Sequence, residues 1–287
     1  MLRRVRGYFA YREADDRHSA AREIETRGFA LLSNVFEPSE IAALAAEINQ
    51  VFDEQSRANR AGSGRTPDDD ECFRYAMLNH SALSQQATAN PKILAAIEPL
   101  LGEDCHIIAN TAWRNPPNDA SSHGGQAWHI DAGPHVPLPE GVTWPADIPH
   151  PVFAIGVHIY LKDCRLEDGP TGVLEGSQLS GKFPPPDESM NDDLTYNGKQ
   201  VVPLLAHAGD VGLFVSDIWH RRMSTTEGDS GRFFLQVHYG RRDIAQRIQT
   251  TETTNHLSEQ AIGRAKTTRE QTLIGLHKPF FYDGKPP

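Results

Sequence analysis

The sequence predicts a mainly β protein, an antiparallel sandwich or barrel that packs against helices preceding it in the chain. Helical apolar patterns fill the first hundred or so residues, and from about residue 105 short apolar runs are broken by Gly, Pro, Asn and Asp, which is typical of β structure. Strands do not alternate with helices, which argues against a doubly wound sheet. We expect one domain over residues 1–287, with a helical part (1–104), a β core (about 105–240) and a C-terminal extension (241–287).

Three helices are expected in the first part. Residues 14–27 form the first, ended by a glycine and followed by a short strand at 29–32. The clearest begins at a Pro-Ser pair and continues over 38–52, and the third covers 91–101. Residues 57–71 are rich in charge and glycine, so we expect a solvated surface loop, with a divalent-cation site at its acidic cluster as the less favoured alternative. The apolar positions of the second helix are Ile41, Leu44, Ala45, Ile48, Val51 and Phe52.

The later strands have two different faces. In one strand the first face carries Arg232, Phe234, Gln236 and His238, and the second carries Phe233, Leu235, Val237 and Tyr239. A barrel with a ligand cavity would turn the mixed polar face inward and pack the apolar face against the helices. A half-exposed sheet explains the same alternation, but an arginine in an otherwise apolar strand favours the cavity. The expected strands are residues 105–109, 127–130, 152–161, 171–174, 201–205, 211–215 and 233–239.

The candidate chemistry centres on Trp128-His129-Ile130-Asp131. On a strand, His129 and Asp131 project from the same side about 7 Å apart, which suits an imidazole and a carboxylate that bind one metal ion. A facial triad needs a third donor, for which His220 is the candidate because it also follows a tryptophan and precedes an arginine. The pair alone is a weak signal, since chance places about one or two acids at the second position after a histidine in such a composition.

These residues resemble the phytanoyl-CoA dioxygenase branch of the iron(II) and 2-oxoglutarate-dependent oxygenases. The matching pieces are the motif at 128–131, the turn at 168–178, the strand from Gly209, then His220, and Arg232 twelve positions later. They occur in the family's order with comparable gaps and cover roughly residues 105 to 240. The resemblance implies that the single domain is a double-stranded β-helix, a cupin-like jelly roll.

The resemblance also implies a ligand set. It implies 2-oxoglutarate on the metal, with the distal carboxylate paired with Arg232, because a guanidinium in a dry cavity can hold a carboxylate bidentately. Gln126 and Thr171 are further candidates for contact with 2-oxoglutarate, although each is equally well explained as an ordinary strand or turn residue. The implied ligands of iron(II) are His129, Asp131 and His220.

By resemblance, the reaction would consume O2, decarboxylate 2-oxoglutarate to succinate and oxidise an unactivated C–H bond. Hydroxylation is the usual outcome, and desaturation, rearrangement and peroxide formation also occur among relatives. Related halogenases have Ala or Gly in place of the carboxylate, so Asp131 argues against halogenation. The alternatives are a jelly-roll metalloenzyme of another class, such as a zinc hydrolase or an isomerase, and a binding protein without catalysis.

Some features depart from the family's pattern or leave choices open. Gln178 stands where many relatives have histidine, and we expect it to affect a turn rather than the metal. The proline-rich segment 135–151 is expected to be a loop at the substrate entrance, where His135 and Trp144 would contact substrate, although a surface excursion is at least as good an interpretation. The remaining histidines considered as alternative ligands are His123, His150, His158, His207 and His238.

Composition limits the partners. The net charge of −10 argues against nucleic acid or an anionic membrane surface, and a mean hydropathy of −0.50 describes an ordinary soluble protein. The three cysteines are far apart and without CxxC spacing, so we expect reduced thiols and a cytoplasmic protein, because neither a signal peptide nor an 18-residue apolar run is recognised. No basic cluster suits the phosphates of coenzyme A. The expected partner is therefore a small molecule, an intermediate of specialised metabolism.

Overall fold

The computed structural model describes residues 19–54, 72–117, 125–131, 133–145, 147–244 and 257–276. Within these residues two antiparallel sheets form the centre of the molecule. The larger has the strand order β1-β7-β4-β9-β3-β2, and the smaller has the order β6-β5-β8. The bounds are β1 Phe29–Leu32, β2 Phe73–Tyr75, β3 His106–Asn115, β4 Ala154–Tyr160, β5 Thr171–Leu174, β6 Val201–Pro203, β7 Val211–Val215, β8 His220–Arg222 and β9 Arg232–Gly240.

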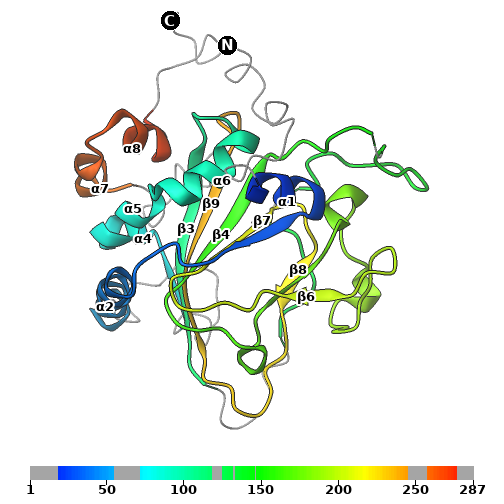
Figure 1. Cartoon of the computed structure of the whole chain (residues 1–287), viewed down its shortest axis with the longest axis horizontal. Helices are drawn as coiled ribbons and strands as arrows, with labels where there is room; N and C mark the ends of the chain where they lie inside the picture. The colour runs from blue at the N-terminus through cyan, green and yellow to red at the C-terminus, as the bar shows by residue number, and fades with distance from the viewer. Residues whose placement is uncertain are drawn as a thin grey trace, which may run out of the picture.

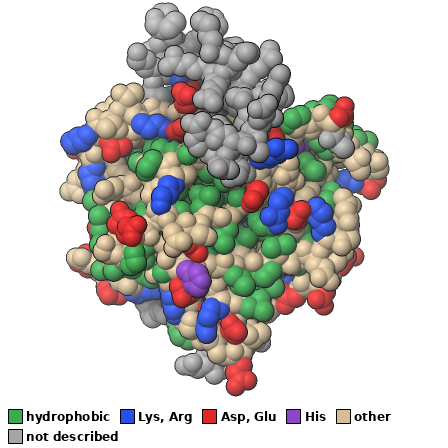
Figure 2. Space-filling view, viewed as in Figure 1, with side chains coloured by type: hydrophobic (Ala, Val, Ile, Leu, Met, Phe, Trp, Pro, Cys, Tyr) green, Lys and Arg blue, Asp and Glu red, His purple; other side chains and the backbone are tan. Residues whose placement is uncertain are grey.

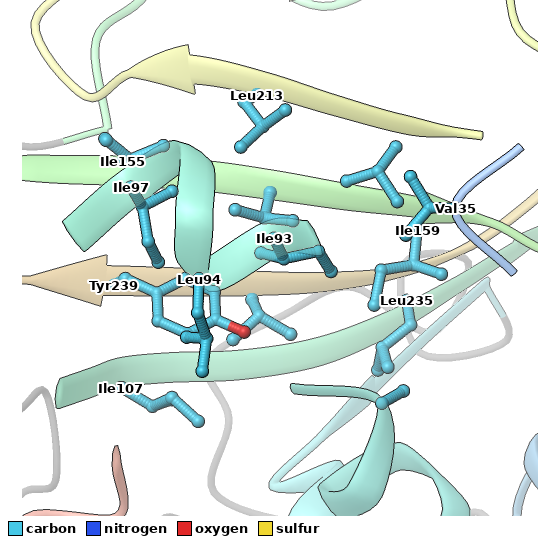
Figure 3. Close-up of a cluster of buried hydrophobic side chains, with 14 of the residues drawn as sticks. Val35, Ile93, Leu94, Ile97, Ile107, Ile155, Ile159, Leu213, Leu235 and Tyr239 are labelled. Carbon is cyan, nitrogen blue, oxygen red and sulfur yellow. The ribbon is translucent and has the colours of Figure 1, made fainter. Parts of the chain in front are cut away.

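Helices cover the face of the larger sheet that points away from the smaller one (Figure 1). Figure 3 shows Ile93, Leu94 and Ile97 of one helix, α6, lying against side chains of the sheet such as Ile155 and Leu213. This is the amphipathic packing that the apolar spacing predicted, and it explains why the apolar faces of β4 and β9 point toward the helices. The described helices are α1 Ser19–Arg27, α2 Pro38–Glu54, α4 Met77–His80, α5 Ala82–Thr88, α6 Pro91–Leu101, α7 Glu259–Arg264 and α8 Thr268–Leu273.

The alternation along β9 has the predicted direction. Phe233, Leu235, Val237 and Tyr239 belong to the main buried cluster together with helix side chains, whereas Arg232 and its neighbours on the other face line a cavity. The strand β4 has the same arrangement: His158 lines that cavity, whereas Ile155, Val157 and Ile159 belong to the main buried cluster. The cavity interpretation is therefore confirmed, and the half-exposed sheet is wrong.

Several boundaries differ from the expectation. Residues 127–130 are not a strand: only His129 forms a single bridge, to His220, and Asp131 lies in a bend. The first helix is described from Ser19 onward, and residues 14–18 lie outside the described part, as does the expected loop at 57–71. The elements β2, α4, α5, β8, α7 and α8 were not expected, because each is too short to show a period in the sequence.

The last two helices pack on the helical layer. Arg269 of α8 makes an ion pair with Glu98 of α6 at 2.9 Å, and Gln85 of α5 donates to the backbone oxygen of Ala261 at 2.8 Å. Figure 2 shows acidic and basic side chains interspersed over one face of the molecule. None of the described helices has both the length and the apolar character needed to cross a membrane.

Candidate active site

Three long-range backbone hydrogen bonds hold the candidate metal-binding segment. The amides of His129 and His220 each donate to the carbonyl of the other at 3.0 Å, and the amide of Asp131 donates to the carbonyl of Ser216 at 3.0 Å. Because β8 belongs to the smaller sheet and Ser216 directly follows β7 of the larger one, the segment crosses the gap between the sheets. Three backbone bonds thus place the predicted side chains without a regular strand.

The tryptophan before each histidine fixes which way the histidine points. Trp128 and Trp219 are buried in one apolar cluster with Leu174 and Leu194. Their indole nitrogens donate to backbone carbonyls, Trp128 to Asn191 at 2.7 Å and Trp219 to Lys182 at 2.8 Å. Since successive side chains of extended backbone alternate, the tryptophans point away from the cavity and His129 and His220 point into it.

His129, Asp131 and His220 lie together. One potential ligand atom from each lies within 4.8 Å of the other two. Donor atoms about 2.1 Å from one ion are separated by up to about 4.2 Å, so a small side-chain shift would complete a site. Two imidazoles and one carboxylate on one side of an ion are the donor set of non-haem iron(II) sites that keep open positions.

The tautomers also fit metal binding. The Nδ1 of His129 faces the carbonyl of Ala127 at 2.8 Å, and the Nδ1 of His220 faces the carbonyl of Ile218 at 2.9 Å. A carbonyl can only accept, so Nδ1 carries the proton in both rings, and in the neutral form of each ring Nε2 keeps its lone pair. The Nε2 of His220 lies 3.5 Å from Oδ2 of Asp131. Both rings therefore present a ligand atom toward the carboxylate.

The charges suit the same role. Burial lowers the pKa of His129, helped by the charge of His220, to about 4. Burial alone would raise the pKa of Asp131, but His220 and His238 outweigh it and hold this pKa well below its ordinary value. The pKa of His220 is raised, because Asp131 outweighs the effect of burial. At neutral pH the site thus has an ionised carboxylate and at least one neutral imidazole, the forms that bind metal.

The three residues line a cavity of about 670 Å³ between the sheets. Arg232, 5% exposed, also lines it; its Nη2 donates to Oδ1 of Asn115 at 3.2 Å. Thr171 is buried in the wall, and Gln126 lies exposed at the rim, where its amide donates to the carbonyl of Arg222 at 3.0 Å. All six residues singled out from the sequence therefore border one cavity.

The cavity contains groups that sequence reasoning missed. Arg222 of β8 is 5% exposed, and its Nε has no hydrogen-bond partner in the described part of the chain. Burial, together with the charge of Arg222, lowers the pKa of Arg232 to about 9, so Arg232 remains a cation at neutral pH. Two buried cations on the wall of one cavity favour an anionic ligand. Arg222 stands two positions after His220, and period-two alternation from that histidine could have identified it.

Two of the histidines considered as alternative ligands also line the cavity. Neither ring nitrogen of His158 has a hydrogen-bond partner among the described residues, and burial, aided by Arg232, lowers its pKa well below the ordinary value. The Nδ1 of His238 lies 3.7 Å from Oδ2 of Asp131. His150 and His207 do not line the cavity, and His123 lies outside the described residues.

The proline-rich loop does not reach this cavity in the residues that are described. His135 binds Asp217, Nδ1 to Oδ2 at 2.7 Å, and its ring stacks on Phe153 with centroids 4.9 Å apart. The indole of Trp144 donates to the carbonyl of Ile148 within the loop at 2.6 Å. Neither side chain lines the cavity, and their contact with substrate stays a prediction. Gln178 is buried in a short turn and does not line the cavity, as expected.

The two sheets and the His-Asp-His group are typical of jelly-roll metalloenzymes, and a comparison with family models agrees with this class. Residues 24–225 match the model described as phytanoyl-CoA dioxygenase (PhyH). The match spans most of the chain, and the chain belongs to this family of enzymes. It includes His129, Asp131 and His220 and ends before Arg232.

Solved structures share the fold. The epimerase SnoN, crystallised with Fe3+, alpha ketoglutarate and nogalamycin RO, has a TM-score of 0.59 at 17% identity over 83% of this chain and 91% of its own. HygX from Streptomyces hygroscopicus, with nickel, 2-oxoglutarate and hygromycin B, has a TM-score of 0.55 at 16% identity over 78% and 87%. The non-heme monooxygenase ThoJ, with nickel, has a TM-score of 0.56 at 20% identity over 86% and 94%. The jelly-roll expectation is confirmed.

Proposed function

We propose that this protein is an iron(II) and 2-oxoglutarate-dependent oxygenase that oxidises a small organic molecule. The observation that carries the proposal is the convergence of His129, Asp131 and His220 within 4.8 Å on the wall of a cavity that also holds the buried cation Arg232. Iron(II) with 2-oxoglutarate supplies, when bound, the decarboxylation to succinate and the oxidation of a C–H bond. The metal and 2-oxoglutarate in the structures of SnoN and HygX support this choice.

In this proposal the residues of the chain bind the metal and orient 2-oxoglutarate. The two Nε2 atoms and the carboxylate would hold the metal and would leave coordination positions open for 2-oxoglutarate and O2. Arg232 holds the distal carboxylate of 2-oxoglutarate, and Thr171 and Gln126 border the same space. Because the Arg232 guanidinium is buried, its interaction with a carboxylate is stronger than it would be in water.

We propose a specialised metabolite as substrate and hydroxylation as the reaction. The relatives SnoN and HygX, crystallised with nogalamycin RO and hygromycin B, support a substrate of this size and kind. A cavity of about 670 Å³ lies within the range of small-molecule sites. Because SnoN is an epimerase, the product decides the reaction: a hydroxylated product is one oxygen atom heavier than the substrate, whereas an epimer has the same mass.

The test is conversion of 2-oxoglutarate to succinate by the protein with added iron(II). His129→Ala should abolish both metal binding and turnover, whereas Arg232→Ala should keep metal binding and raise the KM for 2-oxoglutarate. His207→Ala, an exposed histidine outside the cavity, is the matched control and should behave as wild type. Equal iron binding by wild type and His129→Ala would show that the ligand set is wrong.

A metalloenzyme of another class is the second candidate, and spectroscopy separates it from the first. Anaerobic addition of 2-oxoglutarate to the iron(II) protein should produce a weak visible charge-transfer band. A protein that purifies with zinc, shows no such band and forms no succinate is instead a hydrolase or isomerase on the same scaffold.

A further inference from the structure

A chain of polar side chains runs from the cavity wall to the carboxylate of Asp131. β3 and β9 pair so that Thr111 lies opposite Gln236. The Nε1 of Trp113 lies 2.8 Å from Oε1 of Gln236, and the Nε2 of Gln236 lies 2.8 Å from Nε2 of His238. The other ring nitrogen of His238, Nδ1, lies 3.7 Å from Oδ2 of Asp131. The chain thus links three strand side chains to a residue of the proposed metal site.

The chemistry of the donors fixes the direction of every bond in this chain. An indole nitrogen can only donate, so Trp113 requires the amide oxygen of Gln236 on its side. The hydroxyl of Thr111 donates to the same oxygen at 3.4 Å. The amide nitrogen of Gln236 therefore faces His238, and because that nitrogen can only donate, Nε2 of His238 must accept. A neutral imidazole that accepts at Nε2 carries its proton on Nδ1.

We propose that Trp113, Gln236 and His238 are positioning residues for the metal ligand Asp131. They hold His238 as the Nδ1–H tautomer, and this N–H restrains the carboxylate in the orientation that metal binding needs. The inference rests on the proposed metal centre and adds residues to it. The distance of 3.7 Å exceeds hydrogen-bond length by about half an ångström, so a small side-chain rotation closes it.

The same reasoning excludes His238 as a metal ligand. Its Nε2 lone pair is taken by the amide of Gln236, and its Nδ1 carries a proton, so the ring offers no lone pair to a metal. His238 is 5% exposed, and water does not readily replace either partner. Outer groups that orient a ligand in this way typically contribute a factor of about 10 to 100 in metal affinity.

The experiment measures the affinity of the full-length protein for Mn(II), a redox-stable substitute for iron(II), without 2-oxoglutarate. In His238→Asn the side-chain amide nitrogen takes the position of Nδ1, whereas His238→Leu has a similar size and no donor. We expect about 10- to 100-fold weaker binding in His238→Leu and recovery of most of that loss in His238→Asn. Circular dichroism and the metal-free Tm check that each variant folds.

Two further variants test the outer part of the chain. Trp113→Phe keeps an aromatic ring but removes the donor that fixes the amide of Gln236, so Mn(II) affinity should fall several-fold. Thr111→Val is the matched control, because the indole still orients the amide, and it should bind Mn(II) as wild type does. If His238→Leu fails to fold, this pair decides the proposal.

The outcomes are distinct. Equal affinity of wild type and His238→Leu, equal losses in His238→Leu and His238→Asn, or equal affinity of Trp113→Phe and Thr111→Val each overturn the positioning role and leave the metal centre in place. A wild-type protein that binds no Mn(II) or iron(II) overturns the proposed function itself.

Discussion

At the scale of single residues, the cavity is polar because the fold buries charged side chains in its wall even without a ligand. Asp131 is stabilised as a carboxylate by the surrounding histidines, in spite of its burial. Arg222 and Arg232 are both 5% exposed, and the Nε of neither has a hydrogen-bond partner among the described residues. Desolvated charges of this kind destabilise a protein unless a ligand compensates them.

Arg222 should therefore show opposite effects on stability and on binding. Arg222→Leu removes a buried cation, so the ligand-free protein should be as stable as wild type or more stable, by up to a few kcal/mol. The same change should raise the Kd for 2-oxoglutarate by about tenfold or more, since a charge-assisted hydrogen bond contributes about 1.5–3 kcal/mol. Thermal melts and calorimetric titration of the metal-loaded protein measure the two effects. An unchanged Kd for 2-oxoglutarate would mean that Arg222 does not contact 2-oxoglutarate.

At the scale of elements, the turn before β5 holds the start of β9. Asp168 accepts from the amide and hydroxyl of Ser230 at 2.6 and 2.9 Å and from the amide of Arg165 at 2.8 Å. Arg232, which begins β9, follows two residues after Ser230. The Asp168 carboxylate thereby connects the turn before β5 to the start of β9, the strand that carries Arg232, the residue proposed to bind 2-oxoglutarate.

The contribution of these Asp168 hydrogen bonds to stability should depend on pH. The hydrogen bonds from Arg165 and Ser230 outweigh burial and lower the pKa of Asp168 to about 2, compared with about 4 in an unfolded chain. The bonds thus stabilise the fold fully above about pH 4, by roughly 2 kcal/mol, and this contribution disappears as the pH falls from about 4 to about 2. Denaturant titrations should find Asp168→Asn less stable than wild type at pH 7, with a smaller difference at pH 3. A difference that does not change with pH would contradict the assignment.

At the scale of the whole molecule, the helical layer stabilises a barrel whose interior is partly polar. The apolar faces of β4 and β9 pack on the helices, while their polar faces enclose the cavity. A ligand that binds between the two sheets contacts side chains of both, including His220 of β8 and Arg232 of β9. Binding should thus stabilise the entire fold rather than one loop.

Metal and 2-oxoglutarate together should raise the Tm under anaerobic conditions. A ligand at 100 times its Kd that binds only the folded state adds about 2.7 kcal/mol, which corresponds to roughly 5–10 °C for a domain of this size. Differential scanning fluorimetry of wild type and His129→Ala measures the effect, and the variant should lose the metal-dependent part. Equal shifts in both proteins would place the metal elsewhere.

The regular parts of this fold could be predicted because period and composition are local properties. The spacing of Ile41, Leu44 and Ile48 predicted a helix that buries these three side chains. The alternation from Arg232 to Tyr239 predicted which β9 side chains face the cavity. The tryptophan before each of His129 and His220 favoured these two histidines as the candidate ligands. The strand expected at 127–130 was wrong, because its residues are held by single long-range bonds rather than by a ladder.

The sequence by itself determined the fold class, the inward faces of the strands, and the types of residue that could bind a metal and 2-oxoglutarate. These properties depend on neighbours along the chain. Only the tertiary structure decided that Arg222 lies buried in the same cavity, and that Trp113, Gln236 and His238 form a directed chain to Asp131. Those contacts join separate strands, and they depend on strand register and side-chain rotamers, which no local pattern encodes.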